Sequence, residues 1–175
     1  MASLQTMKPG CGLVALALIA AAPLATAQAP TPIAVFDFEL EDTSAGAGIT
    51  AGRERDRSSM DAVNTEVRRL LAESGRYSLV EVGRADDPAV RDHALRNCNG
   101  CDAGIAAALG AEQSLVGVVR RVSMTEYEVG FRLRDARSGA VIKTQNTDLR
   151  MGANYAWSRG ASRLIKDRLL ETAAQ

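Results

Sequence analysis

The run Leu115-Val116-Gly117-Val118-Val119 is the clearest structural signal in the chain. It is apolar throughout and shows no alternation with polar residues. A strand of this kind is covered on both faces, as at the centre of a sheet that has helices on both sides. The pattern therefore predicts a mixed α/β fold with this run as a central strand.

The segment after this run predicts two further strands. Apolar residues at Tyr127, Val129, Phe131 and Leu133 alternate with charged ones, which is typical of a strand with one face in water. A turn of Arg137-Ser138-Gly139 then leads into the apolar stretch 140–144. We expect these strands to form an antiparallel meander.

The segment before the run begins with a buried strand at Ile33–Phe38. Glu39–Ser58 is acidic, then rich in Gly and Ala, then alternates Arg with acidic residues, and we expect a long loop. A helical spacing of apolar residues follows between Met60 and Leu71, with Ser58 or Ser59 as the expected N-cap. A strand is expected next, at 77–82.

Two more helices are expected. An Ala-rich helix follows Cys101 and ends at Gly110, and a last helix carries the apolar stripe 157–169 with Asn154 as its cap. The element order is then β-α-β-α-β-β-β-α. The predicted architecture is a mixed β-sheet of about five strands packed by three main helices.

The N-terminus has the features of a secretory signal. Lys8 supplies the positive charge, Leu13–Ala22 is an apolar run too short to span a bilayer, and Ala25-Thr26-Ala27 fits the cleavage rule. We expect residues 1–27 to be removed by cleavage after Ala27, residues 28–32 to be a flexible leader and 33–171 to form one α/β domain. The expected location is a bacterial periplasm, with no membrane span.

Charge excludes one class of partner. The chain has 21 Lys and Arg residues against 21 Asp and Glu residues, so its formal net charge is zero. Such a balance supplies no long-range field that would attract nucleic acid or an anionic membrane. We therefore expect no nucleic-acid partner.

Cys98 and Cys101 form a C-x-x-C motif at the start of the Ala-rich helix. Export favours a disulfide between them. A helix N-terminus can also lower a thiol pKa, so a redox-active pair is the alternative, although the preceding polar segment lacks the strand that feeds a thioredoxin-type motif. Metal binding is a third reading, with His93 as another ligand.

Other chemistry has weaker support. Covalent haem needs a histidine where Asp102 stands, and His93 is the only histidine in the chain. No Walker loop, dinucleotide-binding glycine motif or Gly-x-Ser-x-Gly elbow occurs. We predict no catalytic residue, no bound metal and no cofactor.

Several passages together resemble a known group of proteins: Ile33–Glu39, Leu71–Val80, Leu109–Gly117 and Asp135–Gly139, together with Cys98-Asn99-Gly100-Cys101. They resemble a family of exported bacterial proteins of uncharacterised role. More distantly they are similar to the TolB amino-terminal domain and to the related domains of curli-export and penicillin-binding-protein activator lipoproteins. The resemblance covers Ile33 to about Leu170. It implies a binding or assembly module rather than an enzyme, but carries over no anchor and no named partner.

The leading hypothesis is therefore a non-enzymatic periplasmic accessory protein that binds a protein or a small molecule. Ligands of α/β sheets lie beyond the carboxyl ends of strands. By that analogy we expect the ligand or partner surface on the loop after the first strand and at nearby helix starts, with Asp37, Glu39, Arg53 and Arg55. The alternative is a thiol–disulfide redox protein that uses Cys98 and Cys101. Nothing in the sequence selects an oligomeric state.

Overall fold

The structure, a computed structural model, describes residues 29–45, 47, 53–123, 125–150 and 157–171. The predicted signal segment and the predicted cap Asn154 lie outside these ranges. Within them the strands are β1 (Thr31–Val35), β2 (Glu39–Asp42), β3 (Tyr77–Val80), β4 (Gln113–Arg121), β5 (Glu126–Asp135) and β6 (Val141–Arg150). The helices are α1 (Arg53–Glu73), α2 (Pro88–Arg91), α3 (Cys101–Ala108) and α4 (Trp157–Ile165), the last continued by a π-helical turn at Lys166–Leu170. Short 3₁₀ turns lie at Val82–Arg84 and Leu95–Asn97.

The strands form one mixed sheet in the order β3-β1-β4-β5-β6, and β2 also pairs with β4. β1 is parallel to β3 and β4, and β2 is parallel to β4, whereas β4, β5 and β6 are antiparallel. The predicted mixed α/β fold, the central strand and the meander are confirmed. The described sheet has six strands rather than about five, because β2 lies within the segment expected to be a loop.

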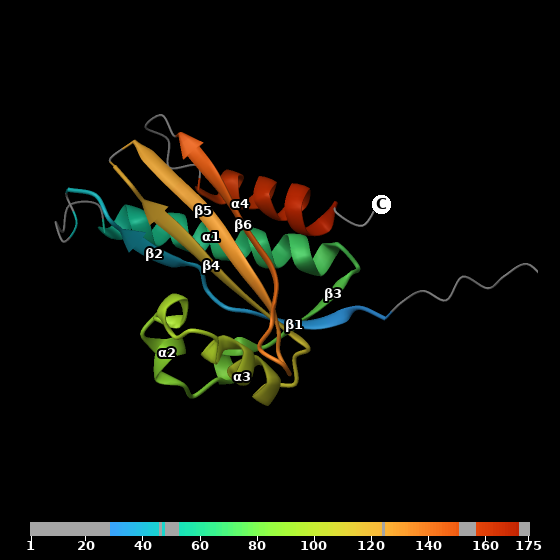
Figure 1. The fold of residues 1–175 in the computed structure, drawn as a ribbon. Helices are drawn as coiled ribbons and strands as arrows, with labels where there is room; N and C mark the ends of the chain where they lie inside the picture. Colours follow the sequence, from blue (N-terminus) through green and yellow to red (C-terminus); the bar gives the residue numbers. More distant parts are fainter. Residues whose placement is uncertain (1–28, 46, 48–52, 124, 151–156, 172–175) are drawn as a thin grey trace, which may run out of the picture.

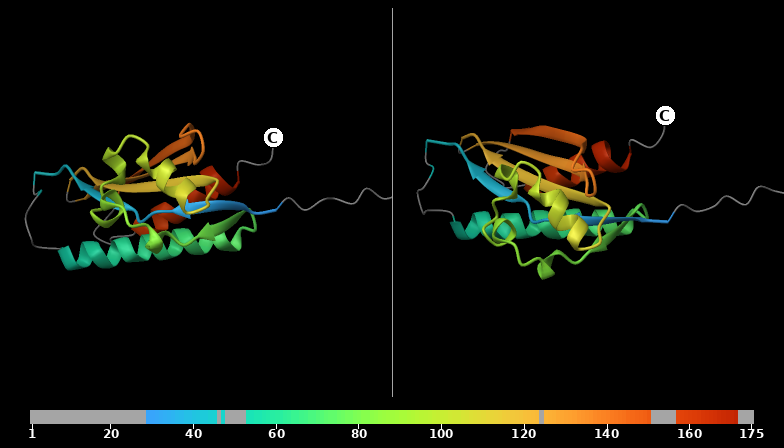
Figure 2. Two further views of the ribbon diagram at one scale, coloured as in Figure 1. Left: turned by 90° about the horizontal axis from the view of Figure 1, so that it is seen from below. Right: turned by 60° about the horizontal axis from the view of Figure 1, so that its bottom comes forward.

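Helices lie on both sides of the sheet (Figures 1 and 2). α1 and α4 pack against each other on one face and share the larger apolar core with the sheet. The segment from α2 to α3 lies on the other face, over a smaller core that includes Phe36, Leu95 and Val116. The two faces are therefore covered unequally.

A register change separates β1 from β2. Glu39 is four positions after Val35, but their partners on β4, Val118 and Leu115, are only three positions apart. The extra residue makes a bulge, and a shift of one residue sends the following side chains to opposite faces. Val35 and, after the bulge, Phe38 both lie in the larger core.

Side chains of α1 satisfy the backbone of this bulge. The Asn64 Oδ1 atom accepts a hydrogen bond from the Phe38 N–H at 2.8 Å. The Arg68 guanidinium donates to the Val35 carbonyl at 3.1 Å and to the Asp37 carboxylate at 2.7 Å. The sequence predicted one strand over Ile33–Phe38, whereas β1 ends at Val35, because the partners that fix the bulge lie on α1 and leave no mark on the strand's own pattern.

The start of α1 was also predicted too late. The helix begins at Arg53 and not after Ser58 or Ser59. Its first turn carries Glu54 and Asp56, which favour a helix N-terminus. Asp56 is buried and accepts a hydrogen bond from Arg121 of β4, so a tertiary contact extends the helix beyond its apolar stripe.

Candidate functional site

A cleft of about 330 Å³ lies on the sheet face that carries the α2–α3 segment. β2, β4, β5, β6 and the turn at Leu95–Asn97 all contribute to it. Its apolar surface includes Val116 and Val118, and Gly130 lines it without a side chain. The polar side chains that line it are Glu41, Arg96, Asn97, Arg120, Glu128, Arg132, Thr144 and Asn146.

Two of the arginines of the cleft have carboxylate partners. Arg120 donates to Glu41 at 2.7 Å and to Glu128 at 3.0 Å. The hydrogen bond and charge of Glu41, aided by those of Glu128, raise the pKa of the Arg120 guanidinium. Arg96 donates to Glu39 at 2.6 Å. Each of these positive charges is thus compensated within the protein.

Arg132 differs from them. Its Nε atom is shielded from solvent and has no hydrogen-bond partner, and the guanidinium forms no ion pair with any residue that the structure describes. The residue lies between Val116 of β4 and Thr144 of β6. The cleft therefore contains one arginine that the described part of the chain leaves uncompensated.

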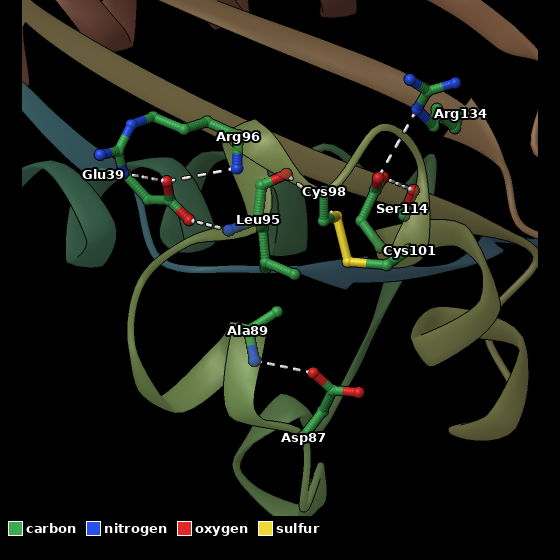
Figure 3. Close-up of a disulfide and its surroundings, with 10 residues drawn as sticks. Glu39, Asp87, Ala89, Leu95, Arg96, Cys98, Cys101, Ser114 and Arg134 are labelled. Atoms are coloured by element: carbon green, nitrogen blue, oxygen red, sulfur yellow. Dashed lines mark hydrogen bonds and ion pairs between the residues drawn. A yellow bond between two sulfur atoms is a disulfide. The ribbon is translucent and has the colours of Figure 1, made fainter.

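Glu39 is buried beneath the turn that precedes the C-x-x-C motif (Figure 3). Its carboxylate accepts hydrogen bonds from the Leu95 N–H at 2.6 Å, the Arg96 N–H at 3.3 Å and the Arg96 guanidinium at 2.6 Å. Glu39 thereby holds Arg96 at the cleft. Its own side chain is only 1% exposed, so Arg96, and not the Glu39 carboxylate, lines the cleft.

The other residues expected at a ligand surface lie elsewhere. Asp37 lines a separate pocket of about 90 Å³ together with Glu39 and His93, and its carboxylate pairs with Arg68. Arg53 and Arg55 belong to the first turn of α1, not to a loop, and Arg55 lines neither this pocket nor the cleft. The structure thus brings Asp37 and Glu39 together and leaves Arg55 apart from these pockets.

Cys98 and Cys101 form a disulfide at the start of α3 (Figure 3). Both residues pack against the smaller core. Gly100, between them, has a φ of +108°, a conformation that side chains rarely adopt. A Cβ at this position would lie 3.6 Å from the Arg134 guanidinium carbon, so the loop of the disulfide rests against that arginine.

Asp102 directly follows the disulfide and is completely buried. Its carboxylate accepts a hydrogen bond from the Ser114 hydroxyl at 2.6 Å, and the Arg134 Nε lies 3.5 Å away. Arg134 also donates to the Gly139 carbonyl at 2.8 Å. These contacts tie the start of α3 to β4 and β5.

The residues of the cleft were not recognised as a site from the sequence. Glu126, Glu128, Arg132 and Arg134 were correctly placed on a strand, but their polar side was taken only as a face in water. Register pairs Arg120 with Glu128 and places Arg132 beside Thr144. A sheet pairing drawn from the predicted meander is the signal that could have found them.

The described residues lack two further features, a metal-binding cluster and a membrane-spanning helix. They contain no group of three or more His, Cys, Asp or Glu side chains placed to hold a metal ion. In the same ranges no helix combines the length and the apolar character that crossing a membrane requires.

Comparison with known proteins gives a family and a fold. Residues 31–169 match the model of DUF3280, described as "Protein of unknown function (DUF2380)". The chain belongs to this family, which confirms the predicted resemblance to a family of uncharacterised role. No curated protein matches the chain.

The chain is similar to solved structures of other proteins. Lipoprotein GNA1162 from Neisseria meningitidis matches with a TM-score of 0.50 and 14% identity, over 80% of this chain and 99% of that one. The LpoB C-terminal domain from Escherichia coli has a TM-score of 0.48 and 14% identity, over 72% and 87% of the two chains. TolB from Acinetobacter baumannii has a TM-score of 0.46 and 15% identity, over 80% of this chain and 28% of that one. At such identities the likeness to GNA1162 concerns the fold alone.

Proposed function

We propose that this member of the DUF3280 family is an exported, non-enzymatic accessory protein whose cleft on the open face of β4, β5 and β6 binds a protein or small-molecule partner. The observation that carries the proposal is the cleft itself. A cleft of about 330 Å³ combines an apolar surface with converging polar side chains, which is the usual composition of a binding site.

Unequal coverage of the sheet supports the same location. The larger core takes side chains from β4 and β5 along most of their length on the α1 and α4 side. On the opposite side, Val116 is the one described residue of β4 in the smaller core. No described residue of β5 or β6 belongs to that core, although Ala136, which directly follows β5, does. The polar remainder of that face is available to a partner.

A non-enzymatic role is supported by how the reactive groups are used. Cys98 and Cys101 are joined to each other. The two buried carboxylates on this side of the sheet, Glu39 and Asp102, bind donors from the protein itself. We therefore assign these groups to holding the α2–α3 segment in place, and not to a reaction.

Asp37, Arg53 and Arg55 remain a proposed secondary contact region, beside the bulge and at the start of α1. We assign Glu39 a positioning role, because it holds the Arg96 guanidinium at the cleft. Export remains part of the proposal. Amino-terminal sequencing of the protein recovered from the periplasm should begin at Gln28, after cleavage at Ala27.

The proposed function is tested with two matched substitutions. Thr144→Trp places an indole in the cleft, and Thr65→Trp places one in the exposed groove between α1 and α4. Each variant is coupled to resin and its retention of periplasmic proteins or metabolites is compared with that of the native chain. We expect the Thr144→Trp variant to retain at least tenfold less of a specific ligand than the native chain does. The Thr65→Trp variant should retain as much of it as the native chain. Equal retention by both variants overturns the proposal.

A further inference from the structure

Arg132 is the arginine of the cleft whose guanidinium has no acceptor among the described residues. Arg96 and Arg120 each bind a carboxylate, whereas the Nε atom of Arg132 is shielded from solvent and donates to nothing. A shielded N–H without an acceptor is unfavourable, so such a group is usually kept for a ligand or an ion. No described carboxylate pairs with this guanidinium.

The surroundings of Arg132 leave room for a ligand. Gly130, two positions earlier on β5, lines the cleft without a side chain. Thr144 and Asn146 line it from β6, in register with Arg132 and Gly130 respectively. They offer a hydroxyl and a carboxamide, groups that can accept or donate hydrogen bonds.

The charges of the cleft select the kind of ligand. Its glutamates, Glu41 and Glu128, are both engaged by Arg120, so this cluster carries one net negative charge, which the charge of Arg132 balances. Arg132 is still the one guanidinium among the described residues lining the cleft that binds no carboxylate. A single guanidinium matches a carboxylate by a two-pronged hydrogen bond. The nearby glutamates repel a dianionic phosphate more strongly than a monoanion.

We infer that the cleft binds a carboxylate-bearing ligand, with Arg132 as the group that receives the carboxylate; this inference rests on the proposed function. Thr144 and Asn146 then contact the neutral part of the ligand that adjoins the carboxylate. Arg96, paired with Glu39, adds no net charge to the site, whereas Arg120 together with Glu41 and Glu128 adds one negative charge.

The inference is tested by ¹⁵N NMR titration of the mature chain with three small probes: succinamate, its neutral counterpart succinamide, and inorganic phosphate. Saturable shifts are expected with succinamate at the backbone amides of Arg132, Thr144 and Asn146. Arg132→Gln should weaken this binding at least tenfold, with an otherwise unchanged spectrum that shows the variant is folded. The control Arg137→Gln removes an exposed arginine of the β5–β6 turn, outside the cleft, and should bind as the native chain does.

The outcomes separate this inference from the proposed function. Equal binding of succinamate and succinamide, tighter binding of phosphate, no saturable binding, or no effect of Arg132→Gln each overturns the carboxylate assignment. If Thr144→Trp still abolishes partner retention in those cases, the cleft remains the binding surface. Succinamate binding that depends on Arg132, combined with unchanged partner retention by Thr144→Trp, supports the assignment and overturns the proposed function.

Discussion

The Glu39 carboxylate accepts a hydrogen bond from the backbone N–H of Leu95 at 2.6 Å, between residues 56 positions apart in the chain. This contact joins the bulged strand to the turn that leads into the disulfide. It exists because the bulge reverses the alternation of side chains and directs Glu39 away from the larger core. The same carboxylate holds Arg96, so fold and cleft depend on one side chain.

Removing this carboxylate should be costly. Glu39→Ala leaves the Leu95 N–H without its acceptor and the Arg96 guanidinium without its counter-charge. We expect the free energy of unfolding to fall by about 3 kcal/mol, the scale for breaking a buried ion pair. Urea denaturation measures it. The control Glu112→Ala removes an exposed glutamate with no described side-chain partner and should change stability by less than about 0.5 kcal/mol; a similar small change for Glu39→Ala contradicts the assignment.

Gly117 should not tolerate a side chain. A Cβ there would lie 2.3 Å from the ring of Phe38, which occupies that space in the larger core. Gly117→Ala should lower the free energy of unfolding by about 2 kcal/mol, the usual cost of overpacking. Adding Phe38→Leu should recover part of this loss, since the two effects are coupled.

Gly104 provides the matched control for this substitution. It lies in α3, and a Cβ there would meet nothing within 4 Å. Gly104→Ala should therefore raise stability by about 0.5–1 kcal/mol, through helix propensity. A loss at Gly104 as large as that at Gly117 means that the contact with Phe38 is not the cause.

The disulfide should act as a structural clasp. It closes a very short loop, so its loss should lower stability by only about 2 kcal/mol in the chain-entropy description. Cys98→Ser/Cys101→Ser should therefore stay folded in thermal unfolding experiments and retain the ligand of the cleft. A structural pair has a reduction potential below about −300 mV. A potential well above that value, or loss of function in the folded double variant, favours the redox alternative.

The Asp42 carboxyl should make the free energy of unfolding depend on pH. Burial raises the pKa of its carboxyl, but hydrogen bonds from Ser44 and the pairing with Arg121 outweigh this and hold the pKa below its ordinary value of 3.8. A carboxyl with a lowered pKa stabilises the fold above that value, and this contribution disappears as pH falls through the folded-state pKa. Asp42→Asn should lower stability at pH 7 by about 1–2 kcal/mol.

The same variant should flatten the loss of stability on acidification below about pH 4. Urea denaturation between pH 7 and pH 2.5 measures this slope for both chains. Parallel curves for the variant and the native chain exclude Asp42 as a source of the acid sensitivity.

The pattern of residues along one segment was sufficient to predict a strand or helix that is defined by its own apolar residues. The central run Leu115–Val119, the meander and the Ala-rich helix fall within observed elements. Pattern failed at β2 and at the first turn of α1, where polar residues are fixed by distant partners: Glu39 by Leu95, and Asp56 by Arg121. Contacts of this kind cannot be read from spacing along one segment.

The candidate site was missed for a related reason. Arg120, Glu128 and Arg132 each have the appearance of a solvated residue on a strand. They become a site only when antiparallel register places them on one face and α3 stops short of covering it. Register across three strands, rather than any motif, defines the cleft.

Site-specific photo-crosslinking tests the central claim, that this cleft is the binding surface, most directly. A photoreactive residue is placed at Asn146 in the cleft, and for comparison at Thr65 on α1, in cells that export the chain. If the cleft is the binding surface, a crosslinked product of one defined mass forms at Asn146, is absent at Thr65 and is lost when Arg132 is replaced by Gln. A product at Thr65 with none at Asn146 contradicts this claim.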